Sequence, residues 1–269
     1  MKKNSEHRLG IFANDEISFS KKLSLKAGFR LDYPLHIGKF YAQPRVNLTY
    51  RMAENWIFNA AVGRYHQFIV KNSIIDDFEN FLYVWNLADN NVIPVLSATH
   101  GTASFLFHQP NFKFQLEGFY KNIDNISIYR LDVNTDKLTQ SRGDSRILGL
   151  DAYLKTNIKK HEFSTTYTLS KTLEYFSHFT AKHYQLAPHN QTHELKTAAV
   201  FNFSPIYFST NYVYGSGLQL TENARNNGRL VPYKRLDMAV LYRLQLKKIK
   251  LYQKPLTQLN LATLLFLKY

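Results

Sequence analysis

The chain has no cysteine, few glycines and prolines, and no long apolar run. Its 269 residues include 11 Gly, 8 Pro and no Cys, which excludes a disulfide framework and a thiolate metal site. The mean hydropathy is -0.33, and no stretch of eighteen apolar residues occurs, so we expect no transmembrane helix. Residues 1–8 carry positive charge but lack a following apolar segment, and we therefore expect no signal peptide there.

Motifs for catalysis are also absent. The sequence contains no Gly-x-Ser-x-Gly elbow, no phosphate-binding glycine loop, no dinucleotide fingerprint and no His-Glu-x-x-His helix. We predict no enzyme activity, no cofactor and no metal site, although a hydrolase with paired carboxylates is unsupported rather than excluded. We interpret two loop clusters as solvated side chains rather than metal ligands: His178, His183, His189 and His193, and Asp76, Asp77 and Glu79.

The pattern that the chain does contain is a strict alternation of apolar and polar residues. In 22–33, the apolar residues Leu23, Leu25 and Phe29 share one face, and Lys26 and Arg30 share the other. Most such segments reach the nine to eleven residues that cross a bilayer as a tilted strand, whereas soluble strands average five or six. We predict eleven segments: 8–20, 22–33, 41–52, 54–66, 94–108, 111–131, 144–158, 160–173, 190–204, 206–217 and 232–246.

The gaps between these segments alternate in length. Short gaps rich in Pro, Asn, Lys and Ser follow the first, third, fifth, seventh and ninth segments, which is typical of tight turns. The longer gaps fall at 34–40, 67–93, 132–143, 174–189 and 218–231. Outer-membrane barrels have short periplasmic turns and long outer loops. We therefore predict an all-β fold, a partial antiparallel up-and-down transmembrane β-barrel of about 11–12 strands, as one domain over 1–269.

The net charge of +14 permits a second interpretation, because basic proteins often bind nucleic acid. Here, however, Lys and Arg alternate with apolar residues along the segments or occupy turns, and they form no single basic block. A polar lumen and basic periplasmic turns account for this distribution. We predict no nucleic-acid partner, and we expect outer-membrane lipid around the wall.

Several motifs, in order along the chain, resemble TonB-dependent outer-membrane receptors. The residues 142–151 (RGDSRILGLD) followed by 163–172 (FSTTYTLSKT) resemble a strand pair of that family. Three further segments resemble other strands of the family in the same order: 63–67 (GRYHQ), 211–217 (NYVYGSG) and 232–237 (PYKRLD). Each motif is weak alone, but their order covers nearly the whole chain.

The resemblance implies a barrel of about 22 strands with a plug domain, of which this chain carries about half the wall. It implies nutrient uptake across the bacterial outer membrane, with an iron chelate, cobalamin or a carbohydrate as the small-molecule substrate. The plug domain and the TonB energy-transducing complex are the implied partners in the full-length parent. We expect that the plug and signal peptide are missing, and we interpret 247–269 as an aberrant end, because its apolar run 261–267 does not alternate.

The candidate functional residues are the polar positions of the alternating segments and the aromatic residues near their ends. We predict a lumen-facing set that contacts substrate or plug: Lys26, Arg30, Asp32, Arg45, Asn47, Arg51, Asp151, Lys155, Glu194, Lys196, Asn211, Arg235, Asp237 and Arg243. We predict a set of membrane-interface aromatics: Tyr33, Trp56, Tyr212, Tyr214 and Tyr242.

Three alternatives to a TonB-dependent receptor stay open at this point. A passive porin-like channel has the same wall. A soluble all-β binding protein with a basic face has the same alternation. A gene fragment without function is the third, because open sheet edges leave backbone groups unpaired in lipid.

Overall fold

The computed structural model describes residues 6–76, 81–132, 135, 137–177, 183–218, 230–243 and 265–268. These residues form strands, turns and bends. No helix among them is long and apolar enough to cross a membrane. The all-β class predicted from the alternation is confirmed.

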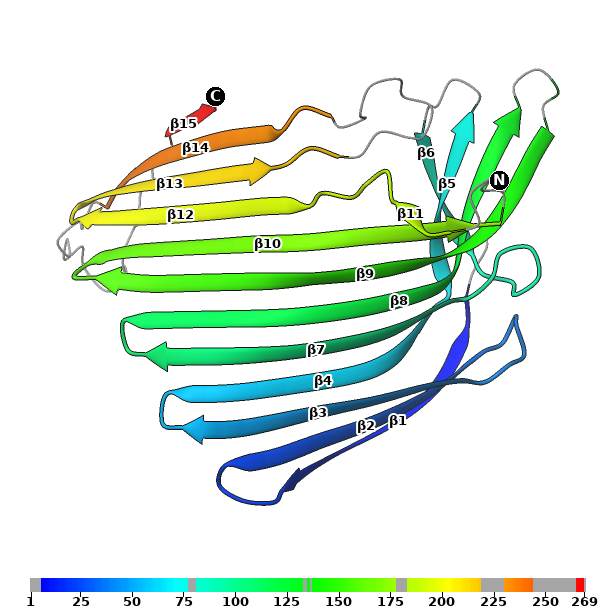
Figure 1. The fold of residues 1–269 in the computed structure, drawn as a ribbon, viewed down its shortest axis with the longest axis horizontal. Coiled ribbons are helices and arrows are strands. Elements are labelled where there is room, and N and C mark those ends of the chain that lie inside the picture. Colours follow the sequence, from blue (N-terminus) through cyan, green and yellow to red (C-terminus); the bar gives the residue numbers. More distant parts are fainter. Residues whose placement is uncertain are drawn as a thin grey trace, which may run out of the picture. The chain divides into compact units, whose positions relative to one another are not determined.

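The strands pair mainly with their sequence neighbours. The hydrogen-bonded order is β1-β2-β3-β4-β7-β8-β9-β10-β12-β13-β14-β15, with β5, β6 and β11 off this path (Figure 1). Within the described residues the order does not return from β15 to β1, so the sheet is unclosed. The bounds are β1 Arg8–Ser18, β2 Leu23–Pro34, β3 Tyr41–Ala53, β4 Trp56–Gln67, β5 Ile69–Asp76, β6 Phe81–Leu87, β7 Leu96–Gln109, β8 Phe112–Asp132, β9 Lys137–Ile158, β10 His161–Phe176, β11 Gln185–Leu186, β12 His193–Phe203, β13 Ile206–Gly215, β14 Tyr233–Tyr242 and β15 Leu265–Lys268.

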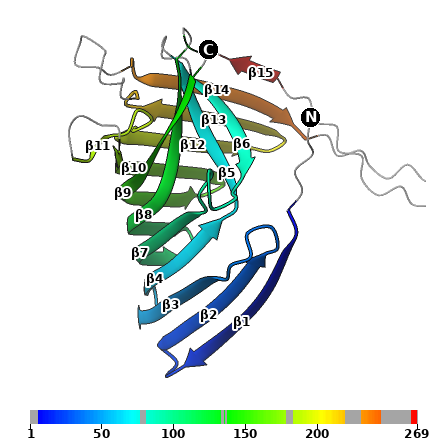
Figure 2. The ribbon, with the colours of Figure 1, turned by 90° about the vertical axis from the view of Figure 1, so that its right-hand side faces the viewer.

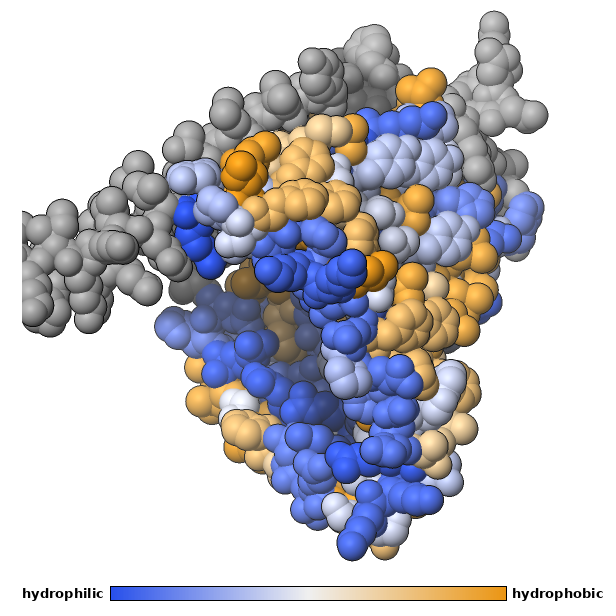
Figure 3. All heavy atoms as spheres, turned by 90° about the vertical axis from the view of Figure 1, so that its left-hand side faces the viewer, coloured by the Kyte–Doolittle hydropathy of each residue, from blue (hydrophilic) through white to orange (hydrophobic). Residues whose placement is uncertain are grey.

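The register places like residues opposite one another. Lys26 lies opposite Asn47 and Arg30 opposite Gln43, whereas Phe29 lies opposite Pro44. Because directly opposed residues share a face of a sheet, each strand pair has a polar face, which contains Arg30 and its cross-strand neighbours, and an apolar face, which contains Phe29 and its neighbours. Figure 3 shows hydrophilic side chains gathered in one band of the surface and hydrophobic side chains in patches beside it.

The chain divides into two compact units. Unit 1 comprises Met1–Phe105, Glu117–Leu150 and Ser170–Asn190. In it, β1 to β4 follow one another in chain order (Figure 2). A small core of Phe68, Val70, Ala88 and Val95 lies beyond the end of β4, and Tyr41, Ile37, Ile93 and Leu96 pack against it.

Unit 2 comprises Leu106–Leu116, Asp151–Leu169 and Gln191–Tyr269. The antiparallel pairs β12–β13 and β13–β14 each extend over ten residues, from Phe203 opposite Ile206 and from Ile206 opposite Tyr242. Rings of Phe201, Phe203 and Phe208 pack together on the apolar face near the β12–β13 turn. Apolar surface therefore continues across adjacent strands of this unit.

The structure differs from the sequence-based prediction in the long gaps. The predicted loop 67–93 contains the hairpin β5–β6, and β5 also pairs in parallel with β8. The extent predicted for the loop 132–143 was wrong, because β9 begins at Lys137. The short strand β11 lies inside the predicted loop 174–189. Residues Leu265–Lys268 pair with β14. The interpretation of 247–269 as an aberrant end stays a prediction.

Truncation of Phe68 tests the small core of unit 1. Phe68 is buried and its ring lies 5.0 Å from that of Tyr41. We expect Phe68→Ala to lower the free energy of unfolding by about 3 kcal/mol, because a buried aromatic leaves a cavity. The measurement is the urea midpoint of the chain in detergent micelles. The control is Ile69→Ala, since the neighbouring Ile69 is exposed; an equal loss in both variants would contradict the assignment of the core.

Candidate functional site

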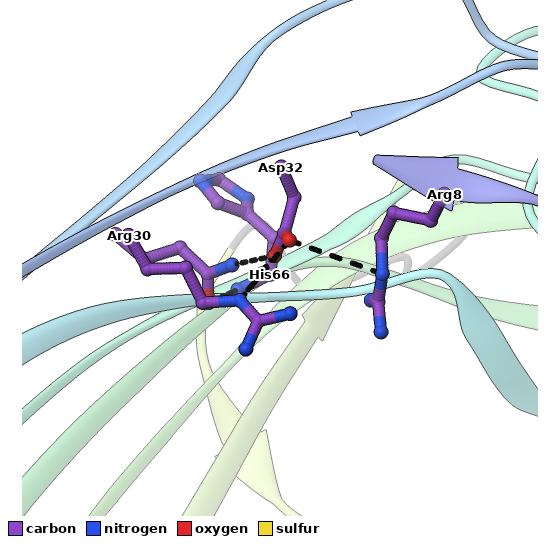
Figure 4. Close-up of polar contacts among 5 residues, drawn as sticks. Arg8, Arg30, Asp32 and His66 are labelled. Carbon is purple, nitrogen blue, oxygen red and sulfur yellow. Dashed lines mark hydrogen bonds and ion pairs between the residues drawn. The ribbon is translucent and has the colours of Figure 1, made fainter. Parts of the chain in front are cut away.

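A buried carboxylate organises the polar face of β1 to β3. Asp32 is 1% exposed, and Nε of Arg30 donates to both of its oxygens at 3.0 and 2.9 Å. Nε2 of Gln43 donates to Oδ2 at 2.5 Å, and Nε of Arg8 lies 3.9 Å from Oδ1. Figure 4 shows Asp32 between the two guanidinium groups, with His66 beside it. β1, β2 and β3 therefore each place a donor near the Asp32 carboxylate. The sequence alone did not reveal this convergence.

Glycines provide the space for these polar side chains. Gly10 lies opposite Asp32 in the β1–β2 register, and a Cβ at Gly10 would lie 2.6 Å from Oδ1 of Asp32. A Cβ at Gly28 would lie 2.6 Å from both Nε of Arg45 and Oδ1 of Asn14. Because real Cβ atoms do not approach polar atoms so closely, larger residues at either glycine would displace the charged groups. The pairing of Gly10 with Asp32 and of Gly28 with Arg45 was not recognised from the sequence.

Several buried polar atoms of unit 1 lack hydrogen-bond partners among the described residues. They are Oη of Tyr41, Nδ1 of His66 and both side-chain amide atoms of Asn72. The rings of Tyr41 and His66 are 5.1 Å apart, and the peptide N–H of His66 donates to Oε1 of Gln43. An unpaired buried polar atom costs about 1–3 kcal/mol.

The other predicted polar residues of unit 1 make weaker contacts. Nζ of Lys26 lies 3.8 Å from Glu16, and Nη2 of Arg45 donates to Asn14 at 3.0 Å. Asn47 lies opposite Lys26 and Ala61, and Arg51 lies opposite Ile57. Of these four residues, Lys26 and Asn47 lie directly opposite each other. Their contact with a substrate stays a prediction.

In unit 2 the predicted polar residues form short local pairs. Nζ of Lys155 lies 2.9 Å from Glu162, and Nζ of Lys196 lies 2.5 Å from Glu194. The hydroxyl of Thr168 donates to Asp151 at 2.5 Å. The remaining predicted residues are Asn211, opposite Ala198 and Asp237; Arg235, whose Nε lies 2.8 Å from Asp237; and Arg243, whose guanidinium lies 5.2 Å from the Tyr207 ring centroid.

Four of the five predicted interface aromatics lie at or next to a strand end, and Tyr212 lies further inside β13. In unit 1, Tyr33 lies one residue before the end of β2 and its ring packs at a tilt against that of Phe40, with the ring centroids 4.7 Å apart, whereas the exposed Trp56 begins β4 after its tight turn. In unit 2, Tyr212 and Tyr214 lie opposite Leu236 and Lys234, and the exposed Tyr242 lies opposite Ile206 at the turn. Their contact with a membrane interface stays a prediction.

The loop end of β10 holds a second acidic site. Glu174 is 13% exposed, and burial raises the pKa of its carboxyl from 4.5 to about 7. The segment after β11 folds back onto it: the peptide N–H of Thr172 donates to Oδ1 of Asn190 at 2.7 Å, and Nε2 of His189 lies 3.9 Å from the Glu174 carboxylate. Since about nine to eleven residues of β10 suffice to span a bilayer, Glu174 lies beyond that length.

Histidines do not assemble a metal site in the part of the chain that the structure describes. No three His, Asp or Glu side chains in those ranges come together as possible ligands. His193 accepts or donates a hydrogen bond with the Tyr167 hydroxyl at 2.8 Å. His178, Asp77 and Glu79 lie outside the described residues.

The paired polar and apolar faces agree with a family match over most of the chain. Residues 1–261 match the family described as "TonB dependent receptor-like, beta-barrel". The chain belongs to the TonB-dependent receptor β-barrel family. The resemblance predicted from the strand motifs is therefore confirmed, and no curated protein matches the sequence.

Solved structures with the same fold include other members of this group. The FrpB iron transporter from Neisseria meningitidis is 12% identical, with a TM-score of 0.62, over 88% of this chain and 38% of that one. A mutant of the ferric enterobactin receptor PfeA from Pseudomonas aeruginosa is 13% identical, with a TM-score of 0.63, over 88% and 37%. The copper transporter OprC is 10% identical, with a TM-score of 0.63, over 89% and 39%.

These similarities concern the fold, because the identities are low. The family and these neighbours are receptors and transporters rather than enzymes. The chain spans less than half the length of each neighbour.

Replacing Asp32 tests the buried cluster. We expect Asp32→Asn to lower the free energy of unfolding by about 1–3 kcal/mol, because it leaves two guanidinium groups without a carboxylate. Asp237→Asn is the matched control, since Arg235 and Asp237 have the same spacing and a similar 2.8 Å contact but are more exposed. The urea midpoint of the control should not change measurably. Equal effects would refute the role of burial.

The raised pKa of Glu174 predicts a pH-dependent stability. A carboxyl whose pKa is higher in the folded state stabilises most below its unfolded value, so stability is lost as the pH rises from about 4.5 through about 7. A shift of this size corresponds to roughly 3 kcal/mol.

The measurement is the urea midpoint between pH 4 and 8.5. Glu174→Gln should flatten this profile, because the amide is neutral at every pH. The control is Glu162→Gln at the half-exposed pair with Lys155, which should keep the wild-type slope. A Glu174→Gln profile as steep as the wild type would contradict the assignment.

Proposed function

We propose that the chain is a wall segment of an outer-membrane TonB-dependent receptor that takes up a small nutrient. The observation that carries the proposal is the family match over residues 1–261. The separation of faces supports it, because Arg30, Asp32 and Gln43 meet on one side of a sheet whose other side carries Phe29. In a membrane wall the first side lines an aqueous lumen and the second contacts lipid.

The proposed substrate class rests on the names of the similar solved structures and not on the residues of the β-sheet. Their names refer to iron, ferric enterobactin and copper, and we propose a metal chelate as the first candidate, with cobalamin and carbohydrate as the other nutrients. We infer that the full-length protein also contains a plug domain and is energised by the TonB complex. The predicted polar residues, such as Lys155 and Arg235, then contact plug or solute.

The absence of cysteine provides a test of the two faces. Lys26 and Phe29 lie on opposite faces of β2, and the wild-type chain gives no labelling background. We expect Lys26→Cys, in outer membranes of a Gram-negative host, to react with a charged, water-soluble maleimide. Phe29→Cys should react at least tenfold more slowly, because lipid excludes the charged reagent.

Three outcomes would overturn parts of the proposal. Equal labelling of the two cysteines, or recovery of the chain without detergent, would favour a soluble all-β protein. Uptake of a metal chelate that persists in cells without the TonB complex would favour a passive channel instead. The wild-type chain and a surface variant, Lys22→Cys in the β1–β2 turn, are the negative and positive labelling controls.

A further inference from the structure

The apolar face of β10, β12, β13 and β14 changes character near one end. Close to the β12–β13 turn this face carries Phe208 opposite Val240, and further along it carries Tyr212 opposite Leu236. The next pair in the same register is Tyr214 and Lys234, and directly opposed residues share a face. Among the paired positions of these four strands, Lys234 is the only lysine, arginine, aspartate or glutamate on this face.

Polar side chains form a row across the four strands at the level of Lys234. Tyr167 lies opposite Leu195, Leu195 opposite Tyr214, and Tyr214 opposite Lys234. All of these residues belong to unit 2, and neighbouring strands lie about 4.8 Å apart. The hydroxyl of Tyr167 lies 2.8 Å from Nδ1 of His193 on the same face. We call Tyr167, His193, Tyr214 and Lys234 the polar row.

The charge of Lys234 has no acidic partner in the part of the chain that the structure describes. The side chain is exposed and takes part in none of the salt bridges there. The acids closest in sequence and register, Asp237 and Glu194, lie on the other face and pair with Arg235 and Lys196. An unpaired cation on an apolar surface attracts an anion from outside the chain, because water screens the attraction less there.

The polar row lies at one boundary of the bilayer, if the chain is the membrane wall proposed above. The tight turn joins Phe203 to Ile206, and β13 continues for 10 residues to Gly215. About nine to eleven residues cross the hydrocarbon at a tilt, so Tyr214 reaches the boundary opposite the tight turn. Outer-membrane barrels have their tight turns on the periplasmic side, which places the polar row among the headgroups of the outer leaflet.

An apolar track continues from the polar row into the hydrocarbon. Leu236, Met238 and Val240 follow Lys234 at alternate positions of β14 and are exposed. From Leu236 to Tyr242 the track extends about 20 Å along the strand, which is comparable to a lipid acyl chain. A molecule that places an anionic headgroup at Lys234 therefore lays its chains on exposed apolar side chains.

We propose that the polar row binds the phosphate of an outer-leaflet glycolipid of the lipid A type. The inference rests on the proposed function for the position of the row in the membrane, and it adds a specific lipid partner. Nζ of Lys234 pairs with the phosphate, and the hydroxyl of Tyr214 donates a hydrogen bond to it. The Tyr167 ring, held by its hydrogen bond with His193, lies against the sugar, since aromatic rings combine apolar contact with a polar edge.

Native mass spectrometry of the whole chain in detergent micelles tests this inference. The probes are lipid A, dephosphorylated lipid A and dioleoyl phosphatidylglycerol, each titrated separately, and inorganic phosphate is added as a competitor. We expect lipid A to bind at least fivefold more tightly than either of the other two lipids. Millimolar inorganic phosphate should not displace it, because free phosphate lacks the chains that contact the apolar track.

Variants of the polar row should change this preference in a defined way. Lys234→Met should weaken lipid A binding about fivefold, as expected for one lysine at an anionic membrane surface, and should leave dephosphorylated lipid A unaffected. Lys234→Arg should retain binding, because arginine also pairs with phosphate. Tyr214→Phe should weaken it about threefold through the lost hydrogen bond. Lys160→Met is the control, since Lys160 is an exposed lysine in the β9–β10 tight turn of the same unit.

Four results would overturn the inference. They are equal binding of lipid A by the wild type and Lys234→Met, equal binding of lipid A and its dephosphorylated form, equal binding of phosphatidylglycerol, and displacement by inorganic phosphate. Circular dichroism identifies any variant that fails to fold, and Lys234→Arg and Tyr214→Phe then supply independent comparisons. The cysteine labelling of Lys26 and Phe29 reports on the membrane wall without lipid A, so failure of the lipid site is distinguishable from failure of the proposed function.

Discussion

The constraint on which this structure depends is that each strand pairs its backbone along the sheet while its side chains meet two different environments. The β2–β3 register keeps Lys26 with Asn47 and Phe29 with Pro44. A slip of one residue would exchange these sets and would place charges on the apolar face. The turns, glycine positions and ion pairs all act to keep this register. Gly10 makes room for Asp32 in the alignment that the structure adopts.

The polar face is not uniform in its electrostatics. Several of its acids pair with a basic residue on the same or a neighbouring strand in exposed positions, as Glu162 does with Lys155. Such pairs contribute little to stability. Asp32 differs because burial and three converging donors bind it tightly to one geometry. The long connections contribute another kind of site, in which Glu174 is buried under residues that follow β11.

Much of the wall could be predicted from the sequence, because the alternation has a period of two and the tight turns have recognisable residues. The segment 41–52 differs from β3 by one residue, and 206–217 begins where β13 begins. The hairpin β5–β6 could not be predicted in this way. Its stability comes from contacts of Val70 with residues distant in sequence and from pairing with β8. The burial of Asp32 and of Glu174 likewise depends on side chains from other strands, and neither residue has a distinctive local pattern.

The parallel pairing of β5 with β8 has a consequence for the order of assembly. The neighbouring pairs β1–β2 and β3–β4 join residues close in sequence, so each closes a short loop. Ser73, in contrast, pairs with Ile128, and the chain between them includes β6 and β7. Loops of that length close late, since their entropy is lost before the new contacts form. The hairpin β5–β6 therefore acquires its fixed position only after β8 has formed. This part of unit 1 folds later than the strand pairs β1–β2 and β3–β4.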